Sequence, residues 1–184
     1  FNGPKGVGAL VLRKGLSWPA LQAGRQERGR RGGTENLPGI VGFAAAAECA
    51  AQTQAQDVLH MQALREALER GLRAAHPAVH VVAEGAPRLP NTVCLRFGLL
   101  DAERVLDKLE RAGLVASSGA ACTAGGTQPS HVLMAMGASA AEAKAGVRLS
   151  LGRETTAQDI EQALAAVHRA VLPLLREAAP AEHV

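Results

Sequence analysis

The chain has 184 residues, of which 47% are apolar and 20% are charged, and it carries a formal net charge of +3. A chain of this length and composition can bury a hydrophobic core, which excludes intrinsic disorder. With no Tyr, three Phe and one Trp, it lacks the stacking surfaces of non-specific single-strand nucleic-acid binders. We find neither a stretch of roughly 18 apolar residues that could span a membrane nor a signal segment, and therefore expect a cytoplasmic protein without membrane contact.

The positive charge is concentrated in residues 25–31, where four arginines and one glutamate carry a net charge equal to that of the whole chain. Nucleic-acid-binding surfaces usually spread Lys and Arg over a face, so this clustering favours a compact anion site and no nucleic-acid partner. The hydroxyl of Thr34 follows the arginines, just before an expected helix. Hydroxyl groups, guanidinium groups and a helix N-terminus all suit a phosphate. A solvated basic loop is the alternative.

The first third of the chain is expected to contain a strand, a loop and a long helical region. Residues 7–13 form a short apolar run typical of a strand covered on both faces. Residues 14–36 indicate a long loop. A helix is expected to begin after Asn36, which can cap it, with Pro38 in its first turn. Its apolar spacing is interrupted by the polar stretch at 53–57, where we place a domain boundary.

From residue 78 onward, short strands and helices alternate, which is an α+β pattern. Strands are expected at 79–83, 92–97, 114–117 and 147–151, and helices are expected to begin near Asp101, Pro129, Ser139 and Thr156, the last with a kink at Pro173. In the last strand, alternation places Arg148 and Ser150 on one face and Val147 and Leu149 on the other. An arginine held on a strand suits bidentate binding of a carboxylate. An ordinary surface ion pair is the alternative.

The three cysteines, Cys49, Cys94 and Cys122, show no C-x-x-C spacing, which argues against a disulfide framework or a zinc site. Cys122 lies in the small-residue run 117–126, which cannot bury much, so we expect an exposed and reactive thiol. The alternative is a small residue in a flexible turn. Cys94 on a strand and Cys49 on a helix are expected to be inert packing residues.

Five motifs share one family resemblance. They are NGPKGVGAL at 2–10, QERGRRGGTEN at 26–36, SSGAACT at 117–123, PSHVL at 129–133 and VRLSLGR at 147–153. In this order they resemble the NifS/IscS-type cysteine desulfurases of the class V aminotransferase family. The resemblance implies an α/β protein of the pyridoxal-phosphate (PLP)-dependent transferase fold type I. Residues 1–53 would end the large PLP-binding domain, and residues 54–184 would form the small α+β C-terminal domain that carries the catalytic cysteine loop.

The resemblance also implies an activity. Such enzymes are homodimers with a shared active site that convert L-cysteine to L-alanine and pass the sulfur to an acceptor or iron–sulfur scaffold protein. By resemblance, Cys122 is the catalytic nucleophile that carries the persulfide, and it can serve as a transient ligand of an iron–sulfur cluster. Arg148 would bind the substrate carboxylate, and Thr34 would bind the PLP phosphate across the dimer interface.

In this family the lysine that binds PLP covalently ends a Ser-x-His-Lys motif that would stand just before Phe1. Lys5 belongs to the following turn, and no other lysine of the chain matches a cofactor motif. We therefore expect the chain to be the C-terminal part of a longer polypeptide, unable by itself to hold the cofactor covalently. The alternatives are a related PLP-dependent lyase, such as a selenocysteine lyase, and a non-enzymatic sulfur or iron–sulfur carrier.

Overall fold

The structure, a computed structural model, describes residues 1–118 and 128–178. They fall into two compact units, unit 1 (Phe1–Ala55) and unit 2 (Gln56–Val184). Helix α2 (Leu37–Ala75) contributes residues to both units. None of the helices in the described ranges combines the length and apolar character needed to cross a membrane.

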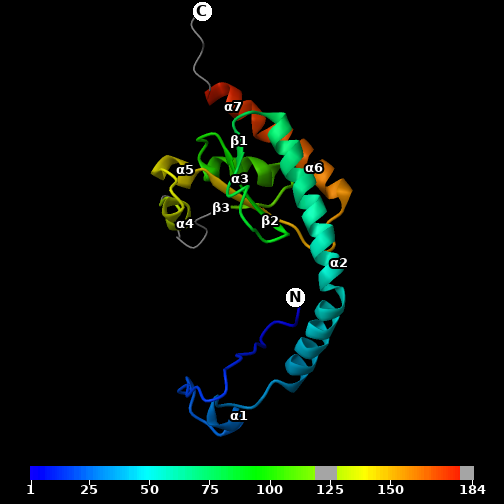
Figure 1. The fold of residues 1–184 in the computed structure, drawn as a ribbon, viewed down its shortest axis with the longest axis vertical. Coiled ribbons are helices and arrows are strands. Elements are labelled where there is room, and N and C mark those ends of the chain that lie inside the picture. Colours follow the sequence, from blue (N-terminus) through cyan, green and yellow to red (C-terminus); the bar gives the residue numbers. More distant parts are fainter. Residues whose placement is uncertain (119–127, 179–184) are drawn as a thin grey trace, which may run out of the picture. The chain divides into compact units, whose positions relative to one another are not determined.

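Unit 1 consists of irregular backbone, the short helix α1 (Gln26–Gly29) and the first part of α2 (Figure 1). The strand predicted at 7–13 is wrong, because this segment is irregular and Val11 is 92% exposed. A strand needs a neighbour to satisfy its backbone N–H and C=O groups, and no described segment pairs with these residues. The predicted loop at 14–36 is interrupted only by α1, in which Glu27 and Arg28 have left-handed backbone angles.

Helix α2 begins where its capping signals predict. The Oδ1 atom of Asn36 accepts a hydrogen bond from the N–H of Gly39 at 3.2 Å, which satisfies one of the free donors of the first turn. The helix then runs for 39 residues without interruption. The polar stretch 53–57 stays helical because it contains neither Pro nor Gly and keeps its polar side chains largely exposed.

Unit 2 is built on a four-stranded antiparallel sheet in the order β1-β2-β4-β3. Its strands are β1 (Val79–Val81), β2 (Thr92–Phe97), β3 (Ser117–Ser118) and β4 (Gly146–Ser150). Its helices besides α2 are α3 (Ala102–Arg111), α4 (His131–Ala135), α5 (Ala140–Lys144), α6 (Ala157–Ala170) and α7 (Leu172–Ala178). The predicted α+β architecture is therefore confirmed.

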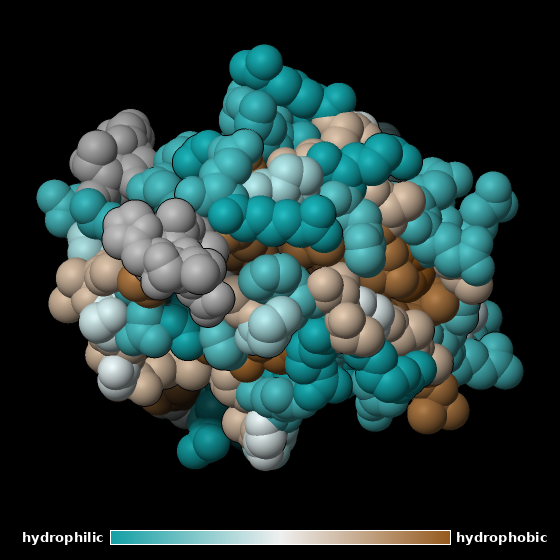
Figure 2. All heavy atoms as spheres, turned by 90° about the horizontal axis from the view of Figure 1, so that it is seen from above, coloured by the Kyte–Doolittle hydropathy of each residue, from teal (hydrophilic) through white to brown (hydrophobic). Residues whose placement is uncertain are grey.

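The core lies between one face of the sheet and helices α2, α3 and α6. Figure 1 shows α2 and α6 side by side next to the sheet. The sheet contributes fully buried side chains at alternate positions, including Val93, Leu95 and Val147. Leu72 of α2 and Val105 of α3 pack in the same cluster. On the surface that Figure 2 shows, hydrophilic residues predominate and hydrophobic residues emerge in smaller groups between them. One face of the sheet is therefore buried in the core, and polar side chains can lie on the other face.

Capping residues and proline explain most of the remaining helix boundaries. Ser139 with Glu142 and Thr156 with Asp159 form the expected capping boxes. Helix α4 is capped by Ser130 rather than starting at Pro129. The last helical region breaks at Val171, close to the kink predicted at Pro173, because proline has no N–H to continue the hydrogen bonds of the helix.

Two strands are shorter than expected. The predicted strand 79–83 ends at Val81, and Ala83 has a positive φ of 54°. The predicted strand 114–117 is displaced to Ser117–Ser118, because the N–H of Leu114 donates to the carbonyl of Leu109 at the end of α3. That backbone group is therefore not available for a sheet.

Candidate functional site

Arg148 lies on the inner strand β4, between strands β2 and β3. Its register partners are Cys94 on β2 and Ser117 on β3. Arg148 and Ser150 are exposed whereas Val147 and Leu149 are buried, so the face predicted from alternation is confirmed. The Nη2 atom of Arg148 donates to the Oγ atom of Ser117 at 3.4 Å. The sheet thus presents a guanidinium group from a strand that is paired on both sides.

The two arginines on this face differ in their partners. Arg96 of β2 forms an ion pair and a hydrogen bond with Glu142 of α5. Arg148 forms no ion pair with any carboxylate in the described part of the chain. A guanidinium without a carboxylate partner can accept one from a ligand, with the two parallel hydrogen bonds that its planar shape favours. Arg148, and not Arg96, is therefore available to an anionic ligand.

Glu142 is held in its ionised form. The backbone N–H of Ser139, the Ser139 hydroxyl and the guanidinium of Arg96 lower the pKa of Glu142 to about 2. The backbone hydrogen bond is the largest of these effects, and it belongs to the capping box of α5. At neutral pH the charge of Arg96 is therefore neutralised, and the positive charge left on this face of the described sheet centres on Arg148.

The two cysteines among the described residues are free thiols in different surroundings. Cys94 is half-buried, and burial raises the pKa of its thiol, although Arg148 and Arg96 oppose that rise. Such a thiol is mostly protonated at neutral pH and is a poor nucleophile, which agrees with the expectation of an inert residue. Cys49 is exposed on α2, so the prediction that it packs is wrong for unit 1.

Cys122, predicted as the catalytic nucleophile and as a transient iron–sulfur ligand, lies outside the described residues. Among the residues that the structure does describe, no group of three or more His, Cys, Asp or Glu side chains could hold a metal ion. The described chain reaches Ser118 on one side of Cys122 and resumes at Gln128 on the other.

Thr34 lies exposed in the arginine-rich loop of unit 1. The Nη1 atom of Arg31 donates to the carbonyl oxygens of Gly33 at 2.9 Å and of Thr34 at 3.1 Å, which folds this arginine back over the loop. Gly33 adopts a φ of 90°, in the region that favours glycine. The hydroxyl of Thr34 has no hydrogen-bond partner among the described residues, so it can donate to an anion such as a phosphate.

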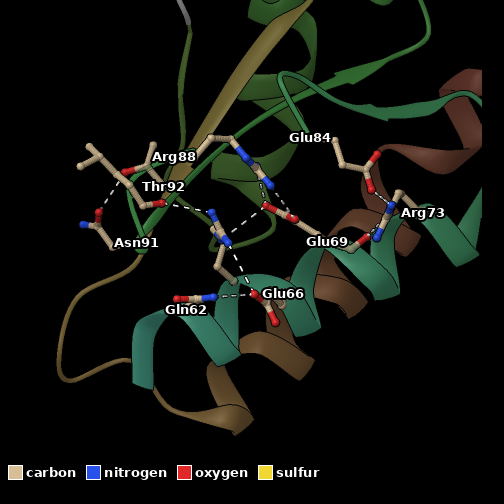
Figure 3. A network of polar contacts seen from close by, with 10 residues as sticks. Gln62, Glu66, Glu69, Arg73, Glu84, Arg88, Asn91 and Thr92 are labelled. Carbon is tan, nitrogen blue, oxygen red and sulfur yellow. Dashed lines mark hydrogen bonds and ion pairs between the residues drawn. The ribbon is translucent and has the colours of Figure 1, made fainter. Parts of the chain in front are cut away.

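A second polar region, which the sequence analysis missed, joins α2 to the segment before β2. Glu69 is only 4% exposed, and Arg88 donates to both of its carboxylate oxygens, at 2.8 and 3.2 Å. Figure 3 shows these two side chains pointing toward each other. Arg65 lies beside them, with its Nε atom 3.6 Å from Glu69. The cluster borders a cavity of about 420 Å³. Arg65 and Glu69 are four residues apart on a helix, and this spacing would have allowed their ion pair to be predicted from the sequence.

Comparison with known proteins identifies the family. A family model described as aminotransferase class-V matches residues 1–163. The chain belongs to the aminotransferase class-V family. A cysteine desulfurase from Cereibacter sphaeroides is 46% identical over 165 residues, which cover 89% of this chain and 42% of that protein. The cysteine desulfurase NifS of Azotobacter vinelandii is 43% identical over 165 residues, covering 89% and 41% respectively.

A solved structure agrees with these relatives. A NifS-like protein superimposes on this class-V chain with a TM-score of 0.80 at 34% identity, covering 92% of this chain and 43% of the other. The resemblance to NifS-type proteins and the PLP-dependent transferase fold type I are therefore confirmed. Enzymes of this family depend on PLP. The class-V chain spans about two fifths of the length of the curated relatives, 42% and 41% for the two named above.

Proposed function

We propose that these residues belong to a PLP-dependent cysteine desulfurase, which converts L-cysteine to L-alanine and retains the sulfur as a persulfide. They would act in a holoenzyme, which we define as the complete enzyme with bound PLP. It includes a region that corresponds to the part of the relatives that this chain does not match. The observation that carries the proposal is Arg148, which has no carboxylate partner among the described residues. It stands on a rigid strand of a chain that is 46% identical to a cysteine desulfurase over 165 residues.

Arg148 would bind the carboxylate of L-cysteine. Its guanidinium can donate two parallel N–H bonds to one carboxylate, which fixes the direction of the amino acid as well as its position. Because β4 is paired with β2 on one side and β3 on the other, the backbone that carries the arginine is held firmly. A side chain on such a strand positions a substrate more accurately than one on a loop.

Thr34 would bind the phosphate group of PLP. Its exposed hydroxyl, the nearby arginines and the backbone N–H groups before α2 are all donors, and a phosphate offers only acceptors. The donor set of this loop therefore fits the cofactor's phosphate. When bound, PLP supplies an electron sink that allows bonds next to the substrate's amino-bearing carbon to break.

Cys122 would act as the nucleophile. Its thiolate attacks the sulfur of L-cysteine, and the carbon–sulfur bond of the substrate breaks with its electron pair left on carbon. That carbon gains a proton and leaves as L-alanine, while Cys122 keeps the sulfur as a persulfide. The substrate carbon is reduced and the two sulfur atoms are oxidised, so no other oxidant is needed. The persulfide would then pass to a sulfur-acceptor or iron–sulfur scaffold protein, where Cys122 can serve as a transient cluster ligand.

The remaining parts of the proposal concern the assembly and its location. We place the enzyme in the cytoplasm, since a persulfide carrier needs a compartment that keeps thiols reduced, and Cys49 and Cys94 are free. We also propose a homodimer with a shared active site. This part of the proposal follows from the resemblance to NifS-type enzymes, whose active site is shared between two subunits.

The test compares alanine release from L-cysteine and from L-selenocysteine in the holoenzyme that contains this chain. We expect Cys122→Ala to abolish release from L-cysteine, whereas the matched control Cys94→Ala keeps it. Undiminished release from L-cysteine by Cys122→Ala would contradict the proposal. Turnover of selenocysteine alone would support the lyase instead, and persulfide on the protein without any alanine would support a carrier.

A further inference from the structure

The strand pairing at Arg148 places one small hydroxyl residue beside the guanidinium. Strand β3 contains only Ser117 and Ser118, and its pairing with β4 sets Ser117 directly opposite Arg148. Residues opposite each other in an antiparallel pair have side chains on the same face, with Cβ atoms about 4.5–5.5 Å apart. The hydrogen bond from Nη2 of Arg148 to Oγ of Ser117, at 3.4 Å, follows from this register.

The direction of the hydrogen bonds suits an acceptor role for Ser117. Its hydroxyl donates to the carbonyl oxygen of Ser118 at 3.2 Å. With its single proton used there, the oxygen meets Arg148 with its lone pairs. The guanidinium has five N–H donors, so this bond occupies one of them and leaves the others for a ligand.

Cys94, the other neighbour of Arg148 on this face, cannot replace Ser117 as the hydrogen-bond acceptor. Cys94, opposite Arg148 on β2, is a weak acceptor, and burial keeps its thiol protonated by raising its pKa. Arg96, one register step away, is already bound to Glu142. Among the described residues, Ser117 is thus the side chain that accepts a hydrogen bond from Arg148.

We propose that Ser117 is a positioning residue, which holds the Arg148 guanidinium in the orientation that meets the substrate carboxylate. This inference rests on the proposed function of Arg148. An arginine side chain that rotates freely loses rotamer entropy when a ligand fixes it. A side chain already restrained by Ser117 loses less of that freedom on binding, and such preorganisation strengthens binding.

The test is made in the holoenzyme, with L-cysteine as substrate and with the product L-alanine as a ligand that has the same carboxylate but no sulfur to transfer. We expect Ser117→Ala to raise KM for L-cysteine and the dissociation constant for L-alanine about three- to tenfold, the worth of one hydrogen bond. The value of kcat should change less than about twofold, because the bond restrains binding rather than the reacting sulfur. Ser117→Thr, which keeps the hydroxyl on a strand, should restore both constants.

Ser150→Ala is the matched control. Ser150 lies two residues after Arg148 on the same face of β4, and it makes no hydrogen bond through its side chain in the described part of the chain. Its replacement should leave both constants unchanged. In an Arg148→Ala background, Ser117→Ala should have no further effect, because the two side chains act as one unit.

Unchanged constants in Ser117→Ala, a failure of Ser117→Thr to restore them, or an undiminished effect in the Arg148→Ala background would overturn the inference. The L-alanine measurement separates it from the proposed function. If the holoenzyme bound L-alanine with the expected dependence on Ser117 but released no sulfur from L-cysteine, the proposed function would fail and the inference on Ser117 would stand.

Discussion

Two arginine-bearing regions of unit 2 use the same side chain in opposite ways. In the cluster between α2 and the segment before β2, Arg65 and Arg88 surround Glu69, and Arg65 and Glu69 are only 7% and 4% exposed. On the polar face of the sheet, Arg148 is exposed and bonded to the neutral hydroxyl of Ser117. In the first region the arginines pair with a carboxylate of the same chain. In the second region the positive charge of Arg148 can pair with the carboxylate of a ligand.

The difference shows where each arginine contributes. A buried charge is tolerated when a partner compensates its loss of water. Glu69 is that partner for Arg65 and Arg88, although the Nε atoms of both arginines are buried without a hydrogen bond in the described part of the chain. An exposed guanidinium costs little to leave unpaired and becomes useful when a planar anion arrives. Changes in the closed cluster should therefore alter stability, and changes at the open arginine should alter function.

Arg148→Ala should have the largest functional effect. We expect kcat/KM for L-cysteine in the holoenzyme to fall about a hundredfold or more, because the substrate carboxylate loses its charged hydrogen-bond partner. Arg148→Lys should restore only part of this loss, since an ammonium group lacks the two-pronged geometry. Steady-state kinetics measure the change. Equal kcat/KM values in Arg148→Ala and the wild type would contradict a role of Arg148 in substrate binding, and with it the functional difference between the two regions.

Glu69→Ala should have the largest effect on stability. Removing Glu69 deprives the buried guanidinium of Arg65 and the partly buried guanidinium of Arg88 of the carboxylate between them, so the free energy of unfolding should fall by about 3 kcal/mol, measured by denaturant titration. KM for L-cysteine should not change. Glu66→Ala is the matched control on the same helix, since the Glu66 side chain is 43% exposed and 3.7 Å from Arg65; its loss should cost under about 1 kcal/mol. Equal losses in both variants would contradict a closed, buried cluster.

Replacing Glu142 should have the smallest effect, a change in stability that is visible only at acidic pH. Its pKa is lowered to about 2 from an ordinary value of 4.5, so the unfolded chain binds its proton more readily than the folded chain. The stability that Glu142 contributes is therefore complete above about pH 4.5 and is lost as the pH falls toward 2. Glu142→Gln should flatten this part of the profile in thermal unfolding. An identical acid profile in the wild type and the variant would show that Glu142 does not hold Arg96 in the manner described.

Features encoded by neighbouring residues could be predicted from the sequence. The cap at Asn36 and the box of Ser139 with Glu142 depend on groups within one helical turn. The exposed face of Arg148 followed from the two-residue period of a strand. These signals are local, so a single sequence carries them.

Features that depend on distant partners could not be predicted. The apolar run at 7–13 has the composition of a strand, but a strand exists only beside another one. The bond between Arg148 and Ser117 joins residues 31 positions apart, and the pair of Arg88 and Glu69 joins residues 19 apart. Both follow from packing and register, which composition does not specify.

Mass spectrometry of the three cysteines after a single turnover tests the central claim most directly. The holoenzyme is mixed with L-cysteine, alkylated and digested, and the peptides that contain Cys49, Cys94 and Cys122 are compared. We predict one added sulfur atom on the Cys122 peptide, none on the other two, and L-alanine in equal amount. Alanine release with no sulfur on Cys122, or with the sulfur on Cys94, would contradict the account.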